Sequence, residues 1–447
     1  MKALHVPLAV FAIIGASTGL TWAEETAHAF AIAVEAPRID TGDTAWVLIS
    51  AGLVMLMTPG LAFFYGGLVR RKNVLSILMQ CMMVLCLVSL QWILFGYSLA
   101  FGPDWNGLVG NLDWAGLRGV GAAPNADYAP TIPHSAFMIF QAMFAVITPG
   151  LILGAFAERM RFGAFCIFSL LWATLIYDPI CHWVWGTGGF LKAMGVLDFA
   201  GGIVVHISAG ISALAAAIFL GRRQGYPHAI SPPHSLPLAV LGAGLLWFGW
   251  FGFNAGSALG ANGLAAAALV NTHTAGAAAG LAWALLDWRF NSSPTMLGMI
   301  TGAVAGLAAV TPAAGFVTPF GALGIGIGAS VICWLFVTLV KAKLGYDDSL
   351  DAFGVHGIGG IWGVVATGLW ANTAVNAAGA NGLFSGGGRL VLVQLAAVGI
   401  AVVFAFVGTS LLLKLVDATA GLRVSDHDER IGLDLTQHRE AAYTVID

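Results

Sequence analysis

The sequence predicts an all-α membrane protein with eleven transmembrane helices, arranged as two inverted repeats of five helices plus one extra helix. Hydrophobic residues make up 58% of the 447 residues and charged residues only 9%, whereas a soluble domain is about 25% charged. Apolar runs of about 20 residues, the length that crosses a bilayer, recur along the chain. The 59 glycines supply the small side chains at which membrane helices pack closely.

The composition also disfavours several other classes of protein. The net charge of −3 gives no basic surface for nucleic acid. The five cysteines are odd in number and fall in or beside apolar runs, which predicts buried thiols and no disulfide framework. No G-x-x-x-x-G-K-[ST] motif is present, which excludes a P-loop ATPase domain. The polar loops are too short for another catalytic domain, and histidines without convergent carboxylates or thiols disfavour a metal site. We therefore expect no enzyme activity and no cofactor.

Residues 1–23 are predicted to be a cleaved signal peptide. The chain begins with a short positive segment, Met1–Lys2, and an apolar run over residues 8–20 that is short for a membrane span. Small residues suitable for cleavage occur at residue 23 and again near residue 29, and the sequence does not choose between them. The alternative is an additional helix that is not cleaved.

Eleven apolar segments follow. In chain order they are Thr44–Val69, Asn73–Phe101, Pro133–Ala157, Phe162–His182, Phe199–Gly221, Leu236–Gly256, Gly263–Trp288, Thr295–Thr311, Phe316–Val340, Leu350–Ala371 and Leu390–Val416. With the mature N-terminus outside, ten Lys and Arg residues lie in cytoplasmic loops and four in external segments. Positive residues stay on the cytoplasmic side, so we predict an N-out, C-in topology. The transmembrane domain covers residues 44–417, and residues 418–447 form a polar cytoplasmic tail.

Two histidines mark a hidden repeat. Asp198 precedes His206 by eight residues, and Asp348 precedes His356 by eight residues. These motifs lie on the fifth and tenth spans, which start on opposite sides of the membrane, as in an inverted repeat. Each Asp is suited to cap its helix. Eight residues at about 1.5 Å each place each His about 12 Å deep in a hydrocarbon core about 30 Å thick. Both imidazoles therefore reach the membrane centre.

The two imidazoles are expected to line a pore, because ionisable groups inside a membrane usually mark a pathway. Desolvation keeps the rings neutral, and one ring can then donate to the other in a shared N–H···N hydrogen bond. Such a passage suits a small neutral polar molecule, since a bare ion is costly to desolvate. The alternative for an isolated histidine, such as His273, is an ordinary hydrogen bond between helices.

Aromatic and hydroxyl side chains on three spans suggest a cation entrance. Trp185 lies at the outer end of the fourth span, Phe144 lies in the third, and Phe253 and Ser257 lie at the outer end of the sixth. Aromatic faces attract cations, and a serine hydroxyl can accept a hydrogen bond from an ammonium group. The alternative is an ordinary interfacial aromatic belt, which composition alone favours.

Six long strings occur in order along the chain. They are PGLAFFYGGLVRRKNVLS (59–76), GAFAERMRF (154–162), LDFAGGIVVHI (197–207), WFGFNAGSA (250–258), DAFGVHGIGGIWG (351–363) and GLRVSDHDERIGLD (421–434). On these strings the sequence closely resembles the ammonium transporters of the Amt/Mep/Rh family, and within it the bacterial Amt branch. The resemblance extends from Thr44 to Tyr443.

The resemblance implies a role for particular residues. The external substrate site of the family falls on Phe144, Trp185 and Ser257, and its stacked gate falls on Phe144 and Phe253. The paired pore histidines of the family fall on His206 and His356. Its structurally essential carboxylate falls on Asp198, and a threonine of its pore region falls on Thr311. Two departures from the family pattern are one additional residue between Trp185 and Asp198, and Ala352 where a larger aliphatic residue is usual. The second departure is expected to widen the lower pore.

The resemblance also implies what the protein does. It would bind ammonium outside, with methylammonium as an analogue, remove a proton, and pass ammonia along the pore. The proton either returns outside or crosses by a separate route, and the resemblance favours net charge transfer. A homotrimer in the cell inner membrane and a PII-type signalling protein bound near the tail are also implied. The alternatives are an ammonium sensor and a gas channel of the same fold.

Overall fold

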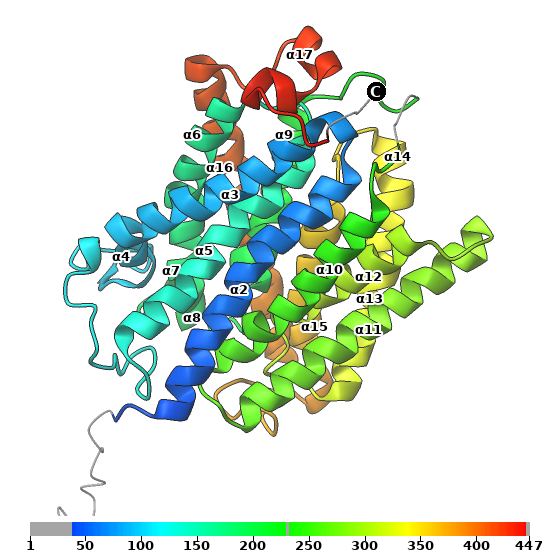
Figure 1. The fold of residues 1–447 in the computed structure, drawn as a ribbon. Coiled ribbons are helices and arrows are strands. Elements are labelled where there is room, and N and C mark those ends of the chain that lie inside the picture. The colour runs from blue at the N-terminus through cyan, green and yellow to red at the C-terminus, as the bar shows by residue number, and fades with distance from the viewer. Residues whose placement is uncertain (1–37, 229–231, 444–447) are drawn as a thin grey trace, which may run out of the picture. The chain divides into compact units, whose positions relative to one another are not determined.

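The computed structural model describes residues 38–228 and 232–443, and the predicted signal peptide lies outside them. The described chain is a bundle of long helices (Figure 1). Its principal helices are α2 (Thr41–Leu68), α3 (Val74–Gln91), α5 (His134–Phe156), α6 (Phe162–Trp172), α7 (Asp178–Trp185), α9 (Ser208–Leu220), α10 (Leu236–Trp250), α11 (Gly263–Asn291), α12 (Met296–Val310), α13 (Pro319–Leu335), α15 (Ile358–Trp370) and α16 (Gly388–Ala420).

The remaining elements are short. They are α4 (Tyr97–Phe101), α8 (Phe190–Ala193), α14 (Lys341–Leu344), α17 (Asp426–Ile431) and the antiparallel strand pair β1 (Asp104–Trp105) and β2 (Val109–Gly110). Several long helices are continued or joined by π-helical turns, of which six matter for the spans: η2 (Trp92–Gly96), η4 (Ala173–Tyr177), η5 (Gly202–Ile207), η6 (Phe251–Ala255), η8 (Phe336–Val340) and η9 (Phe353–Gly357). Such turns are frequent at functional sites.

Each of the eleven predicted segments contains a helix. Within residues 38–228 and 232–443, nine helices are long and apolar enough to cross a membrane. The other two are α12, which has 15 residues, and α11, which has 29 residues but carries more polar side chains. The count of eleven spans therefore stays a prediction. All five cysteines are free, as predicted. Cys81, Cys181 and Cys333 are buried, whereas the prediction of burial is wrong for the exposed Cys86 and the half-buried Cys166, because both lie on helix faces that the rest of the chain does not cover.

Short polar side chains begin many of these helices. Asp40, Ser235, Asn262, Thr295 and Thr318 each accept a hydrogen bond from a backbone N–H in the first turn of the helix that follows. The first backbone N–H groups of a helix have no partner within it, so these side chains fix where the helix starts. The sequence encodes these boundaries locally.

Glycines set the closest helix contacts. A Cβ atom on Gly67 of α2 would lie 2.5 Å from the backbone nitrogen of Ala239 in α10. A Cβ atom on Gly242 of α10 would lie 2.1 Å from the backbone nitrogen of Phe64 in α2. Only glycine leaves room for the two backbones at these points, as is common where membrane helices pack.

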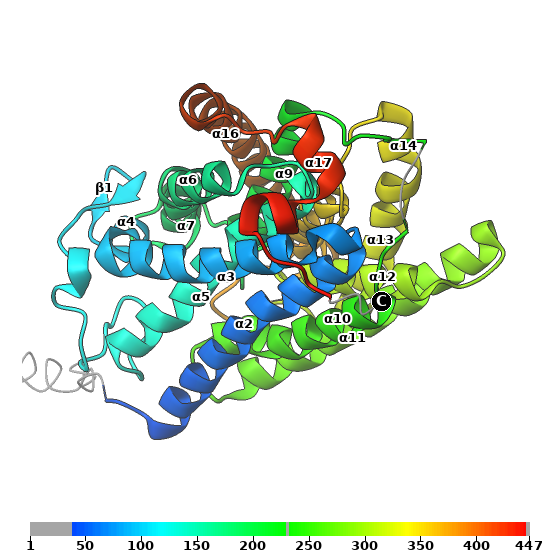
Figure 2. The same cartoon turned by 45° about the horizontal axis from the view of Figure 1, so that its top comes forward.

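The C-terminal tail packs against the helix bundle as far as Tyr443. Figure 2 shows the red tail segment with α17 lying over the ends of the blue and green helices. Asp434 accepts from the backbone N–H of Ser76 in α3 (2.8 Å), and Arg423 donates to the carbonyl of Leu220 at the end of α9 (2.8 Å). The tail therefore contacts the first and second thirds of the chain at once.

Candidate functional site

The carboxylate of Asp198 caps the start of the helix that carries His206. The side chain of Asp198 accepts hydrogen bonds from four consecutive backbone N–H groups, those of residues 201–204, at 2.5–3.2 Å. These four donors belong to Gly201, directly before η5, and to the first three residues of η5, and they have no partner within the helix. The prediction that Asp198 caps this helix is confirmed.

The second histidine helix is built in the same way. Asp348 accepts from the backbone N–H groups of Ala352 (3.1 Å) and Phe353 (2.8 Å), at the start of η9. His356 lies in that π-helical turn, as His206 lies in η5. The predicted cap at Asp348 is also confirmed, although it engages two donors and not four.

The two histidine helices cross at glycines. A Cβ atom on Gly210, four residues after His206, would lie 2.0 Å from the backbone nitrogen of Gly357. A Cβ atom on Gly360, four residues after His356, would lie 2.9 Å from the Cβ of His206. The glycine four residues after the histidine therefore contacts the other helix in both motifs. A two-fold axis that relates the two motifs would produce this reciprocal contact.

This crossing places the imidazoles side by side in the core. Their ring centroids are 5.3 Å apart, the ring planes differ by 13°, and His206 and His356 are 1% and 3% exposed. No hydrogen bond joins the rings, and both ring nitrogens of His206 and Nδ1 of His356 have no partner in the described part of the chain. The prediction of an N–H···N hydrogen bond between the rings is therefore wrong. The distance between the rings is set by the capped helix starts and by the close crossing of the two helices at glycines.

Two more aromatic rings pack against His206. We call the series of packed rings from His356 through His206, Trp250 and Phe253 to Phe144 and Trp185 the column. Trp250 lies 5.6 Å from His206 with ring planes 25° apart, and Phe253 lies 6.2 Å from His206 at 26°. The indole Nε1 of Trp250 donates to Oγ1 of Thr311 (3.0 Å), and that hydroxyl donates to the carbonyl of Leu307 (2.8 Å). Thr311 therefore fixes the indole that packs on the first histidine.

Trp250 lines the same small cavity as the two histidines, and the sequence analysis did not assign it to the site. It stands in one of the strings quoted above, three residues before Phe253. Residues three apart share a helix face, so this spacing was a usable signal once Phe253 was assigned to the pore.

Thr311→Val is expected to destabilise the protein and perturb the column. The substitution removes the acceptor for the Trp250 indole N–H and leaves a buried donor without a partner, which costs about 1–3 kcal/mol. Thermal unfolding of the purified protein in detergent measures the loss. Thr367→Val is the matched control, because the buried hydroxyl of Thr367 donates only to Gly363 of its own helix. Equal unfolding temperatures for the two variants would contradict this role of Thr311.

The outer residues meet at the other end of the column. The rings of Phe144 and Phe253 lie 4.2 Å apart at 33°, and Trp185 packs edge to face on Phe144 at 5.9 Å and 89°. The indole Nε1 of Trp185 donates to the backbone carbonyl of Asp198 (2.8 Å), so the residue that caps η5 also holds this ring. The tertiary structure thus joins side chains from three spans that spacing alone could not bring together.

Ser257 is tied to the same group through Phe253. Its hydroxyl donates to the carbonyl of Phe253 (2.9 Å), one helical turn earlier, and the side chain is partly buried. Among the hydrogen bonds of the described residues, none joins Ser257 to Phe144 or Trp185. His273, the other histidine considered above, is exposed on the surface of α11, where its ring lies 5.6 Å from that of Trp247, and it is not part of the column.

The space around the histidines is narrow. A cavity with about 10 Å³ of room for water-sized molecules is lined by both histidines, Trp250 and Phe253, with apolar side chains completing the wall. Roughly 10–15 Å³ is what one water molecule needs. A second cavity of about 810 Å³ also begins at His356 and reaches Arg222 and Lys341. Ala352, where the family usually has a larger residue, lines this wider cavity.

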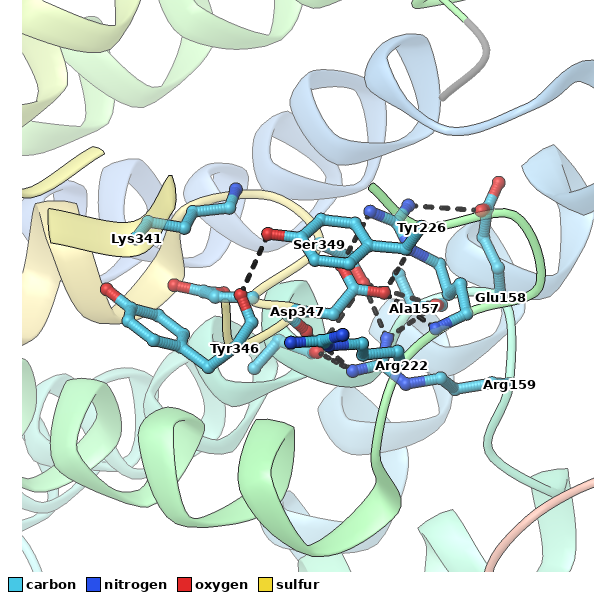
Figure 3. A network of polar contacts seen from close by, with 12 residues as sticks. Ala157, Glu158, Arg159, Arg222, Tyr226, Lys341, Tyr346, Asp347 and Ser349 are labelled. Atoms are coloured by element: carbon cyan, nitrogen blue, oxygen red, sulfur yellow. Dashed lines mark hydrogen bonds and ion pairs between the residues drawn. The ribbon is translucent and has the colours of Figure 1, made fainter. Parts of the chain in front are cut away.

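A polar network (Figure 3) includes Arg223 and Ser349, which also line the wider cavity. Glu158 forms ion pairs with Arg70 (2.9 Å) and Arg223 (3.2 Å), and Arg223 also pairs with Asp347 (2.8 Å). Arg159 is buried beneath it and donates to the backbone carbonyl of Asp347 (2.7 Å). The network ties the loop after α5 to the loops that follow α2, α9 and α14.

The charges of this network lower the pKa of both carboxylates. Burial alone would raise the pKa of Glu158, but Arg223 and Arg70 outweigh it and lower the pKa from its usual 4.5. Burial likewise opposes the shift at Asp347, where hydrogen bonds and charge from Arg223, with Arg159, lower the pKa from its usual 3.8. Both groups therefore favour the folded state when they are ionised.

The unfolding temperature is expected to fall as the pH is lowered below these usual values. A carboxylate with a depressed pKa contributes its full stabilisation above the unfolded value and loses it as the pH falls through the folded value. Glu158→Gln should make the fall shallower, as measured by thermal unfolding across that acid range. Glu440→Gln, at an exposed carboxylate, is the matched control and should leave the profile unchanged. A profile for Glu158→Gln as steep as that of the unmodified chain would contradict the assignment.

The fold and the rings of the column define a class of protein: a helical membrane protein with a narrow internal cavity, lined by Trp250, Phe253 and two buried histidines. Comparison with known proteins makes the assignment specific. The chain belongs to the ammonium transporter family, because the model of the Ammonium Transporter Family matches residues 45–443. It is accordingly a multi-pass membrane protein of a family of transporters.

Individual relatives agree with this assignment. The ammonium transporter of Bacillus subtilis strain 168 is 55% identical over 402 residues, which cover 90% of this chain and 98% of the relative. The crystal structure of Saccharomyces cerevisiae Mep2 has a TM-score of 0.82 at 37% identity, with 88% of this chain and 89% of the other covered. A structure described as a sensor Amt protein has a TM-score of 0.82 at 29% identity, with 89% and 98% covered.

Proposed function

We propose that this protein transports ammonium by recruiting the cation at an outer aromatic site, removing a proton, and conducting ammonia past two neutral histidines. The observation that carries the proposal is the pair of buried imidazoles with unpartnered nitrogens beside a cavity of about 10 Å³. A cavity of that size holds about one small molecule, and the free nitrogens offer it a hydrogen-bond acceptor and donor.

Recruitment takes place at the Phe144–Trp185 pair and Ser257. The face of an aromatic ring attracts a cation by about 0.5–2 kcal/mol, with Trp the strongest. The hydroxyl hydrogen of Ser257 is already donated to Phe253, so its oxygen lone pairs remain to accept from an ammonium N–H. Ammonium and potassium are of similar size, and this site separates them by hydrogen bonding.

The stacked rings of Phe144 and Phe253 form the gate. A cation that passed them would leave water and aromatic contact for an apolar passage, at a cost far above the recruitment energy. Loss of a proton removes most of this cost, and ammonia then passes when the rings move apart. Potassium has no proton to lose and stays outside.

The histidines conduct ammonia without binding it strongly. With both rings neutral, each has one N–H donor and one acceptor nitrogen, which match the acceptor and the donors of ammonia. The wider cavity beyond His356, with its Arg and Lys side chains, provides the aqueous exit where ammonia is protonated again. The proton that ammonium lost crosses by a separate route, so that transport carries net charge.

The assembly that we propose has eleven spans in an N-out, C-in topology, with two inverted repeats of five spans and one extra helix. The reciprocal crossing of Gly210 and Gly360 with the opposite histidine motif supports the two-fold relation. A signal peptide precedes the transmembrane domain of residues 44–417, and the tail of residues 418–447 lies in the cytoplasm. We also propose a homotrimer in the cell inner membrane, with a PII-type signalling protein bound beside the tail.

Reconstitution of the purified protein into liposomes tests the proposal. Ammonium and methylammonium gradients should each produce uptake and current, and potassium should produce neither. Absence of ammonium flux from correctly inserted protein would overturn the transport proposal and favour the sensor alternative, for which the similarity to a sensor Amt protein is the supporting observation. Flux of carbon dioxide without flux of ammonium would favour the gas channel. Deletion of residues 421–447 distinguishes a transporter from a pure sensor. A pure sensor loses its signalling output on deletion and has no ammonium flux either before or after it.

A further inference from the structure

A second polar cluster lies in the helix bundle outside the column described above. Gln91 is the last residue of α3, directly before the π-helical turn η2, and Asp178 is the first residue of α7, directly after the π-helical turn η4. Both side chains are buried, with exposed fractions of 2% and 0%. The mechanism proposed above uses neither of them.

The hydrogen bonds of this pair do not balance if Asp178 is a carboxylate. The amide Nε2 of Gln91 donates to Oδ2 of Asp178 (2.7 Å) and to Oγ1 of Thr174 (3.3 Å), which uses both of its hydrogens. The hydroxyl of Thr174 donates to the carbonyl of Leu170 (2.9 Å), so it supplies no hydrogen to the pair. Oε1 of Gln91 and Oδ1 of Asp178 are then two buried acceptors without any donor.

Exchanging the oxygen and nitrogen of the Gln91 amide does not remove the deficit. The amide oxygen would then lie 2.7 Å from Oδ2 of Asp178, and two acceptors so close require a proton between them. The amide lies directly against Gly96, where a Cβ atom would be 2.5 Å from its terminal nitrogen and oxygen. Either orientation of the amide lacks one hydrogen.

No positive charge compensates a carboxylate at this position. Among the ion pairs of the described residues, none includes Asp178. The titratable neighbours on its own helix are Tyr177, Cys181 and His182, and both ring nitrogens of His182 are engaged by Ala100 and Asp104.

No cation among the described residues acts on Asp178 from the elements packed around it either. Asp198, from the segment before η5, faces this region with a carboxylate already bound to four N–H groups. The rings of Trp92 and Trp172 pack on Tyr177 at 6.3 and 6.4 Å. An unpaired carboxylate in such surroundings is far more costly than a neutral acid.

We propose that Asp178 is a proton-binding site inside the membrane, a neutral carboxylic acid that donates from Oδ1 to Oε1 of Gln91 while the Gln91 amide donates to Oδ2. One proton from solvent enters with Asp178 as the chain folds. The two planar groups then form a cyclic pair in which every hydrogen and every acceptor is matched. The pair joins α3 to the start of α7, the helix that ends at Trp185.

Infrared difference spectroscopy of the full chain in lipid tests the proposal directly. The spectrum of the unmodified protein minus that of Asp178→Asn should contain the C=O stretch of a protonated carboxyl group, shifted in heavy water, and no carboxylate bands. Asp127→Asn, at an exposed aspartate, is the matched control and should remove carboxylate bands only. Loss of carboxylate bands in Asp178→Asn would overturn the proposal.

Substitutions at the pair give an independent measurement. Asparagine at position 178 preserves the cyclic pair, because its amide donates to Oε1 of Gln91 and its oxygen accepts from Nε2. Asp178→Asn should therefore match the unmodified protein in unfolding temperature and in ammonium flux, whereas Asp178→Ala, which leaves Gln91 unpaired, should unfold at a lower temperature. A lower unfolding temperature for Asp178→Asn would show that the negative charge is needed and would overturn the proposal. The spectrum does not depend on transport, so failure of the proposed function leaves this test intact.

Discussion

Asp198→Ala is expected to abolish ammonium transport while the protein still reaches the membrane. The substitution removes the acceptor of four backbone N–H groups at the start of η5. Each buried donor left without a partner costs about 1–3 kcal/mol, so this turn must rearrange, and His206 lies within it. The backbone carbonyl of residue 198 also holds the Trp185 indole. One substitution therefore displaces the outer site and the first histidine together.

Initial uptake of labelled methylammonium, normalised to the amount of protein in the membrane, measures this loss. Asp348→Ala is the related comparison and should have a smaller effect, because that cap engages two donors. Asp127→Ala, at an exposed site, should be neutral. Normal flux in Asp198→Ala at a normal membrane level would show that the cap is dispensable.

Replacement of both His206 and His356 by leucine removes two hydrogen-bonding partners, at about 2–6 kcal/mol together, and is expected to reduce ammonia conduction about thirtyfold to twenty-thousandfold. Each imidazole offers hydrogen bonds to a molecule in a cavity that is otherwise apolar. Removal of one such partner costs about 1–3 kcal/mol, and about 1.4 kcal/mol corresponds to a factor of ten in rate. Leucine fills a similar volume, so the loss reports on polarity more than on pore width. Stopped-flow measurement of internal pH in proteoliposomes gives the rate.

His273→Leu is the matched control for this experiment. His273 also lies in one of the predicted spans, but it is exposed on the surface of α11 and contacts Trp247 and Phe251. Its replacement should leave the rate unchanged. A double variant that conducts at the original rate would mean that a purely apolar passage suffices, and the role of the two imidazoles would be refuted.

Local sequence signals were sufficient for the starts of the two histidine helices. The eight-residue spacing from Asp198 to His206, and its copy at Asp348, predicted two capped helices, and both caps are present. The same signals failed for the bond between the rings, since a hydrogen bond depends on tenths of an ångström in the helix crossing. They also missed Trp250, whose partner Thr311 lies 61 residues away in sequence.

The sequence by itself determined that this chain is a helical membrane protein of the ammonium transporter family, because hydrophobicity, caps and motif strings are properties of neighbouring residues. Only the tertiary structure decided which side chains of the candidate site lie together. Phe144, Trp185 and Phe253 come from separate helices, and the histidine helices meet where Gly210 and Gly360 let two backbones touch. Such contacts depend on how whole helices pack together. The spacing of residues along one helix does not specify which other helix packs against it, or where.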